Sequence, residues 1–384
     1  MTKTTPHIRV HHHNDYLISF YAGRDQSERH LKERNWLDDS ALKLGTAMYA
    51  IHSGAEAVVY DTFASVAHAE FVRSYLEQLG IRKFTAVLSH WHLDHIAGNA
   101  VFDDGDIIAT SLTRDALLRH KADIEAGKVW GTPPIAPLIL PNIVFDNHLE
   151  LRVGEIELEL RRMNIHSIDG CVVYLPRDKF LLAGDRLEDP LTYMIELENL
   201  AEHLRQLKEM KGWDIAKILP DHGDPDIIRA GGYDKTLIDA TVDYITQMLS
   251  RAHDANYLDG SMEDYLAHSA AKGWIRPFEP YREVHEQNLK LVHDYWKDKT
   301  LPEVPPSQAG SPLPSSSARG SAASGSSSKG SSSSRRSRAP LGLGMEKPGG
   351  RFESSRPAPL SSFSPGRSWI WSKPKCSRKL AVVP

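Results

Sequence analysis

Four side chains of metal-binding type stand within six residues of this 384-residue chain. They are His90, His92, Asp94 and His95, in the spacing H-x-H-x-D-H. Imidazole nitrogens and carboxylate oxygens crowded in this way suit zinc, and iron and manganese accept the same donors. A loop that bound nothing would leave four polar side chains to be compensated at the end of a strand. The spacing therefore predicts a metal site.

Three further candidate ligands lie far along the chain, in the order His166, Asp185 and His222. Asp185 ends the apolar run Phe-Leu-Leu-Ala-Gly-Asp, where an aspartate has little structural use. A single histidine is usually satisfied by the protein core or by water. His166 and His222 are therefore supported by their order and their flanking residues more than by their type.

This order of motifs resembles the metallo-β-lactamase-fold hydrolase superfamily. The resemblance covers roughly residues 8–250 and includes an early aspartate, Asp61, after an apolar run. It implies two metal ions held by the predicted ligands, divided as His90, His92 and His166 for one ion and Asp94, His95 and His222 for the other. Asp185 would bridge the two ions, and Asp61 would orient a metal-bound histidine without binding metal itself.

One turn departs from the pattern of the superfamily. The usual sequence around the third histidine is His-Thr-x-Gly, whereas this chain has His166-Ser-Ile-Asp-Gly. The Ser167 hydroxyl can replace that of threonine, but the glycine is displaced by one position to Gly170. We therefore expect a different local turn after His166.

The resemblance implies two Zn²⁺ ions, with iron or manganese as alternatives, and a hydrolase acting through a metal-bridging hydroxide. The expected substrate is a small-molecule ester, thioester, lactone or amide, and Asp94 is the expected catalytic residue because it would face the metal-bound water. An iron-dependent sulfur dioxygenase on the same fold is an alternative, although the metal sites of such enzymes resemble mononuclear ones. A non-catalytic binding protein is another, although such relatives typically lose ligands.

Apolar runs and turn signals predict the elements that position the metal loop. Residues 84–88 are expected to form a buried strand, preceded by a helix over 65–79. A helix is expected to open at 96–99, and another over 111–127 with Ser111 as its N-cap. The proline-rich segment 131–141 is expected to form a loop over the site.

The remaining periodicity predicts two sheets flanked by helices. Expected strands cover residues 8–10, 16–21, 46–51, 56–61, 106–109, 143–145, 148–153, 156–162, 171–175, 180–182 and 215–219. Expected helices cover residues 196–210, 234–251, 261–271 and 281–297. This α/β pattern agrees with the four-layer αββα sandwich that the resemblance implies, as a domain of residues 1–300. Its appended helices, 252–300, either only pack on the sandwich or also form a wall of the substrate pocket.

From residue 301 to 384 the composition turns to serine, glycine and arginine, which predicts a disordered tail. This tail has thirteen Lys or Arg and three Glu, a balance of +10, so the first 300 residues carry −14. An acidic body does not favour nucleic acid as its partner, whereas the basic tail could bind it weakly. The tail is either such an interaction segment or a dispensable extension.

The expected compartment is the cytoplasm. Two cysteines, Cys171 and Cys376, do not suggest a disulfide framework, and the N-terminus lacks the apolar core of a secretory signal. No stretch approaches the length of a membrane span, so no membrane partner is expected. A small-molecule substrate is the expected partner, and the sequence does not indicate an oligomeric state.

Overall fold

The computed structural model describes residues 7–24 and 29–302, all within one unit, Met1–Ser311. The predicted tail, 301–384, lies outside the described residues except for its first two. In the described part of the chain, no helix is long and apolar enough to cross a membrane.

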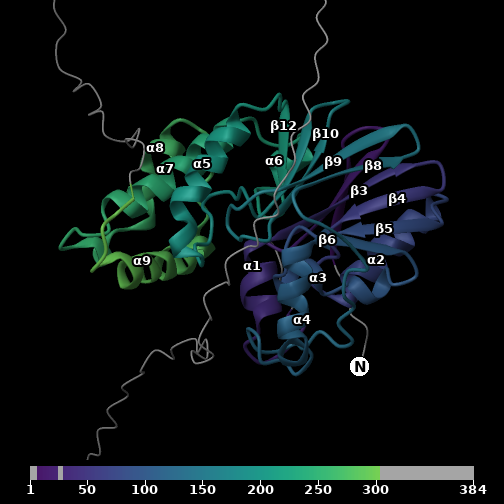
Figure 1. Cartoon of the computed structure of the whole chain (residues 1–384), viewed down its shortest axis with the longest axis horizontal. Helices are drawn as coiled ribbons and strands as arrows, with labels where there is room; N and C mark the ends of the chain where they lie inside the picture. The colour runs from purple at the N-terminus through teal and green to yellow at the C-terminus, as the bar shows by residue number, and fades with distance from the viewer. Residues whose placement is uncertain (1–6, 25–28, 303–384) are drawn as a thin grey trace, which may run out of the picture. The chain divides into compact units, whose positions relative to one another are not determined.

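The larger of two sheets has seven strands in chain order, antiparallel from β1 to β4 and parallel from β4 to β7 (Figure 1). Its strands are β1 (Ile8–His12), β2 (Leu17–Ala22), β3 (Thr46–Ser53), β4 (Glu56–Tyr60), β5 (Lys83–Val87), β6 (Asp106–Thr110) and β7 (Ile143–Phe145). Helix α2 (Val66–Gln78) joins β4 to the parallel strand β5, so the three elements form a βαβ unit.

The smaller sheet has five strands in the order β12-β11-β10-β9-β8. They are β8 (His148–Val153), β9 (Ile156–Arg162), β10 (Cys171–Leu175), β11 (Phe180–Gly184) and β12 (Lys217–Pro220). Strands β8 to β11 pair antiparallel, and β12 pairs parallel to β11. The carboxyl ends of β11 and β12 therefore lie next to each other.

Side-chain alternation along the strands divides the core into two layers. On β2, Leu17 and Tyr21 belong to the core shared with the smaller sheet, whereas Ile18 and Phe20 face the core under α2. Both sets are buried, so β2 is covered on its two faces. This arrangement confirms the predicted αββα sandwich.

Helices cover the outer faces of both sheets. The longer ones are α2, α4 (Ser111–Glu125), α5 (Leu200–Lys211), α7 (Thr236–Ser250), α8 (Met262–Ala271) and α9 (Arg282–Trp296). The shorter ones are α1 (Leu42–Leu44), α3 (Leu93–Ile96) and α6 (Pro225–Arg229), with a π-helix at Leu37–Ala41 and 3₁₀ turns at Asn99–Val101, Leu197–Asn199, Tyr257–Asp259 and Glu279–Tyr281. In Figure 1, α5, α7, α8 and α9 form a group on the side away from α2.

Several predicted boundaries were wrong. The helix expected to open at 96–99 begins at Leu93, because His92 is already the extended residue before the first turn. Thr110, not Ser111, caps α4, and its Oγ1 accepts a hydrogen bond from the Thr113 N–H at 3.1 Å. The chain enters α5 only at Leu200, after a 3₁₀ turn, and α6 was not predicted.

Candidate metal centre

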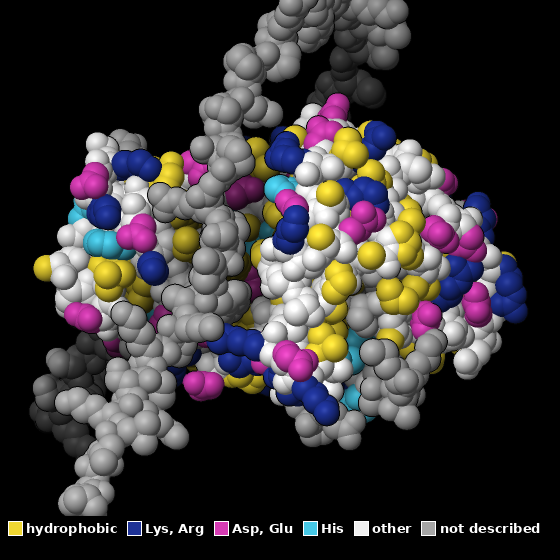
Figure 2. Space-filling model, turned by 90° about the horizontal axis from the view of Figure 1, so that it is seen from below, with side chains coloured by type: hydrophobic (Ala, Val, Ile, Leu, Met, Phe, Trp, Pro, Cys, Tyr) yellow, Lys and Arg dark blue, Asp and Glu magenta, His cyan; other side chains and the backbone are white. Residues whose placement is uncertain are grey.

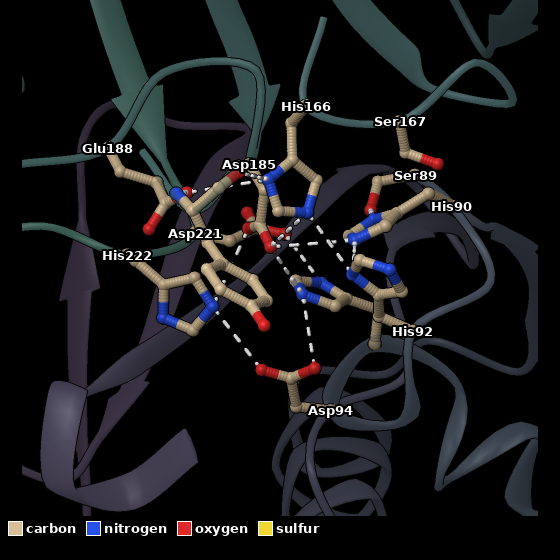
Figure 3. Close-up of polar contacts among 12 residues, drawn as sticks. Ser89, His90, His92, Asp94, His166, Ser167, Asp185, Glu188, Asp221 and His222 are labelled. Atoms are coloured by element: carbon tan, nitrogen blue, oxygen red, sulfur yellow. Dashed lines mark hydrogen bonds and ion pairs between the residues drawn. The ribbon is translucent and has the colours of Figure 1, made fainter. Parts of the chain in front are cut away.

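All seven predicted ligands meet at one end of the two sheets. Figure 3 labels six of them, all except His95. The segment after β5 carries His90 and His92, and the first turn of α3 carries Asp94 and His95. Asp185 follows β11, His222 follows β12, and His166 lies in the connection between β9 and β10. Because strands β5, β11 and β12 all end here, residues far apart in sequence share one small volume.

The donor atoms form two groups. In the first, His90 Nε2 lies 2.8 Å from His92 Nδ1, which lies 3.1 Å from His166 Nε2. In the second, Asp94 Oδ1 is 3.5 Å from His95 Nε2, and Asp94 Oδ2 is 3.3 Å from His222 Nε2. Two nitrogens bound to one tetrahedral zinc would be roughly 3.3 Å apart, so both groups have the spacing of metal ligands.

Asp185 lies between the two groups. Its Oδ2 is 3.5 Å from His90 Nε2 and 3.1 Å from His95 Nε2, and its Oδ1 is 3.6 Å from His222 Nε2. The Oδ1 atom is buried and makes no hydrogen bond to any described residue. A buried carboxylate oxygen in this state requires a partner, and a cation between the groups would supply one.

Hydrogen bonds to the chain fix which nitrogen of each ring is free. His166 Nδ1 donates to the Tyr193 carbonyl at 3.1 Å, and His222 Nδ1 donates to the Gly45 carbonyl at 2.6 Å. A carbonyl can only accept, so these rings carry their proton on Nδ1. In the neutral rings, each Nε2 lone pair therefore points into the site.

The rings of the metal loop are held in related ways. His90 Nδ1 bonds the Ser89 hydroxyl at 2.9 Å, and His95 Nδ1 donates to Asp61 Oδ2 at 2.8 Å. Asp61 also accepts from the Ser89 N–H at 2.6 Å. Asp61 thus orients His95 and the loop without joining the ligand groups around Asp185, as the resemblance implies. His92 differs, since it offers Nδ1 to the site.

Electrostatics separate the two groups. Burial lowers the pKa values of His90 and His166 well below their ordinary value and that of His92 to about 3, so these rings are neutral donors. Burial acts in the same direction on His95 and His222, but the carboxylates of Asp185 and Asp94 outweigh it. They raise the pKa of His95 well above its ordinary value and that of His222 to about 10. In this group a bound metal ion would replace the ring protons as the positive charge that balances the carboxylates.

The backbone is strained around the site. Asp61 and His166 have φ angles of 65° and 66°, and Phe63 and Trp130 have 70° and 55°. Residues other than glycine rarely adopt this left-handed region, and such outliers gather where function imposes a geometry. The strain is spread over three connections of the chain that surround the ligands.

Four buried polar residues near the ligands were not predicted from the sequence: Asp169, Arg186, Glu188 and Asp221. Asp221 Oδ2 lies 3.2 Å from His95 Nδ1, so this ring faces two carboxylates. Burial and the Asp61 charge raise the pKa of Asp221 well above its ordinary value, which favours its neutral form. Burial and the Asp185 charge raise the pKa of Glu188 to about 8. The sequence signal for Arg186, Glu188 and Asp221 is only their proximity to Asp185 and His222, whereas Asp169 lies in the altered turn after His166.

Asp169 explains the altered turn after His166. Its Oδ2 accepts from the Trp91 N–H at 3.0 Å and from the Thr113 hydroxyl at 2.9 Å, and its Oδ1 accepts from Ser167. The residue that displaces the expected glycine thus ties the His166 turn to the metal loop and to α4.

Aromatic rings border the site on the side of His92. The Trp130 ring lies 4.9 Å from that of His92, and Trp91 stacks on His120 with centroids 5.0 Å apart. Trp91, His120 and Trp130 are partly exposed. Trp130 directly precedes the predicted loop 131–141, so this end of the loop reaches the metal centre.

The segment that carries all seven predicted ligands matches a known family. Residues 42–222 match the family model of the metallo-beta-lactamase superfamily. The match confirms the predicted resemblance: this segment belongs to that superfamily.

Similar solved structures carry related names. A metallo-beta-lactamase from Pontibacter korlensis shares 16% identity, covering 61% of this chain and 96% of that one, with a TM-score of 0.46. The DIM-1 metallo-beta-lactamase exposed to ceftazidime shares 18% identity over 62% of this chain and 99% of its own, with a TM-score of 0.44. TMB-1 shares 18% identity over 61% and 98%, with a TM-score of 0.45.

Proposed function

We propose that this protein is a dinuclear zinc-dependent hydrolase of a small-molecule ester, thioester, lactone or amide. The observation that carries the proposal is the meeting of two donor groups at one carboxylate, Asp185. A site for a single ion would need only one of the groups. Membership of the superfamily supports a metal-dependent hydrolase in general terms.

The proposed ligands divide as the donor groups do. One ion would be held by His90, His92 and His166, the other by Asp94, His95 and His222, with Asp185 between them. When bound, two zinc ions would supply a hydroxide at neutral pH and polarise the carbonyl that it attacks. The chain keeps the rings in place for this task through the Tyr193 and Gly45 carbonyls and Asp61.

Asp94 has the most accessible carboxylate among these ligands. Its side chain is 12% exposed, against 5% for Asp185. Both Asp94 oxygens face other ligands, yet the residue opens toward solvent, from which water and substrate must arrive. We assign it the second role of accepting a proton from the attacking water.

The proposed partner is a small molecule. Figure 2 shows Lys and Arg side chains interspersed with Asp and Glu over the described residues on that face, which is unlike a continuous basic surface for phosphates. Trp91 and Trp130 would offer an apolar contact beside His92. The proposed compartment is the cytoplasm, on the composition of the sequence alone.

The proposal is tested with purified protein and a panel of ester, thioester, lactone, amide and β-lactam substrates. Hydrolysis of one class that is abolished by chelation and restored by zinc is the expected result. A protein that holds one iron and consumes oxygen in place of hydrolysing any of them would instead be the sulfur dioxygenase named as the alternative.

A further inference from the structure

Helix α9 lies beyond residue 222, where the match to the superfamily ends, yet one of its side chains contacts the segment that bonds His166. Asn288 is fully buried on this helix. Its amide contacts the segment 192–194, which follows Asp185 and leads toward α5.

Asn288 uses both ends of its amide on this segment. Its Nδ2 donates to the Thr192 carbonyl at 2.8 Å, and its Oδ1 accepts from the Met194 N–H at 2.8 Å. A carbonyl can only accept and an N–H can only donate, so the orientation of the amide is fixed by its partners. Asn288 thus binds the segment as the backbone of a neighbouring strand would.

The residue between these two bonds presents its backbone to the opposite side. The Tyr193 carbonyl accepts from His166 Nδ1 at 3.1 Å, and its N–H donates to Glu188 Oε1 at 3.2 Å. Glu188 Oε2 in turn accepts from the hydroxyl of Tyr281 at 3.2 Å. Tyr281 directly precedes α9. The segment is therefore held by α9 on one side and holds His166 on the other.

We propose that Asn288 is a positioning residue for His166, which makes α9 part of the metal centre. The Nδ1–H bond to Tyr193 sets the ring plane of His166 and leaves Nε2 free, and it can do so only while the segment keeps its place. This inference rests on the proposed metal binding.

The arrangement has an asymmetric consequence. His166 belongs to the donor group of His90 and His92 and not to that of Asp94, His95 and His222. The second group is oriented through Asp61 and the Gly45 carbonyl. The hydrogen bonds of Asn288 go to Thr192, Met194 and Tyr244 instead. Loss of Asn288 should therefore lower the affinity for one zinc ion and leave the affinity for the other unchanged.

The test is zinc binding by the full chain in competition with a chelator, with Asn288→Leu as the variant. Leucine keeps a similar volume and removes all three side-chain hydrogen bonds of Asn288, two to the segment 192–194 and one to Tyr244. We expect the affinity for one equivalent of zinc to fall by about 10–100-fold, the usual effect of losing a group that orients a ligand. Asn288→Asp should have an intermediate effect, because a carboxylate can accept from Met194 but cannot donate to Thr192.

Two control variants separate positioning from general loosening of the helices. Gln247→Leu removes another buried amide, which donates to Asp243 and to the Tyr265 carbonyl and not to the segment 192–194. Tyr244→Phe removes the hydroxyl that accepts from Asn288 at 3.1 Å but keeps both backbone bonds. Both should retain two zinc ions with the affinity of the wild type, even where their melting temperatures fall.

Wild-type zinc affinity in Asn288→Leu would overturn the inference, as would an equal loss of zinc in Gln247→Leu. Should the leucine variant not fold, Asn288→Asp measured against Gln247→Leu decides in the same way. A wild-type chain that binds no zinc is a separate outcome, since it overturns the proposed function first and this inference with it.

Discussion

At the scale of single residues, the site depends on which nitrogen each imidazole offers. Carbonyl acceptors settle this for His166 and His222, and a carboxylate does so for His95. The two carbonyls are backbone groups, so the sequence does not show them, whereas the resemblance already implied the role of Asp61. Ligand types and order were predictable from sequence, whereas the ring orientations set by backbone carbonyls were not.

The role assigned to Asp94 predicts a loss of activity without loss of the fold. Asp94→Ala removes one ligand and the proposed proton acceptor, while His95 and His222 keep their contacts with Asp185. Positioned general-base groups contribute about 100–10,000-fold, so turnover should fall by at least that factor. Circular dichroism should match the wild type. Near-normal turnover in this variant would exclude Asp94 from both roles.

His68 predicts part of the pH dependence of stability. Burial, and then the nearby His30, lower the pKa of His68 to about 3. The folded protein therefore keeps this ring neutral, whereas the unfolded chain takes up a proton below about pH 6.5. The linked stability is complete above that pH and is lost as the pH falls.

Between pH 7 and pH 5 this linkage should remove about 2 kcal/mol from the free energy of unfolding. Urea unfolding of the wild type and of His68→Gln at both pH values measures it, and the variant should lose less stability by that amount. Equal losses would show that His68 is protonated in the folded state.

At the scale of elements, the metal loop depends on a contact between connections that are distant in sequence. Asp169 joins the turn after His166 to Trp91 of the loop and Thr113 of α4. Asp169→Ala should leave these donors unpaired and cost about 1–3 kcal/mol. Because the loop would move, zinc affinity should also fall, by about 10-fold or more.

A matched control for Asp169 is Thr113→Val, which removes one donor to the carboxylate but leaves the bond from Trp91. The two variants should differ in melting temperature and in zinc affinity, and only Asp169→Ala should lose zinc affinity. Unchanged affinity in that variant would mean that the loop holds its shape without the carboxylate.

Strands and long helices followed from hydrophobic periodicity, which is a local property. The short elements next to the site did not follow from it. Helix α3 begins at Leu93 because His92 is extended and the ligands Asp94 and His95 must turn back toward β11. That requirement comes from residues nearly a hundred positions away, so no window of local sequence contains it.

At the scale of the whole molecule, the described body supplies every proposed ligand and both sheets. The tail from 301 to 384 remains a prediction from composition. A chain ending at Thr300 should keep its metal content, its turnover and its melting temperature. A drop of more than a few degrees, which corresponds to roughly 1 kcal/mol in a domain of this size, would mean that the removed residues pack on the body.

The appended helices show what sequence reading alone could not decide. Their periodicity predicted α8 and α9, but two uses stayed open, as packing elements or as a pocket wall. The structure points to a third, since Asn288 and Tyr281 hold the segment that orients His166. Such a use depends on hydrogen bonds across about a hundred residues, which no periodic pattern records.

The most direct test of the central claim is the metal content of the purified full chain, measured together with hydrolysis before and after chelation. The account predicts about two zinc ions per chain, hydrolysis that is lost when both are removed, and recovery when zinc is returned. One iron per chain with oxygen consumption, or hydrolysis that survives complete removal of metal, would contradict it.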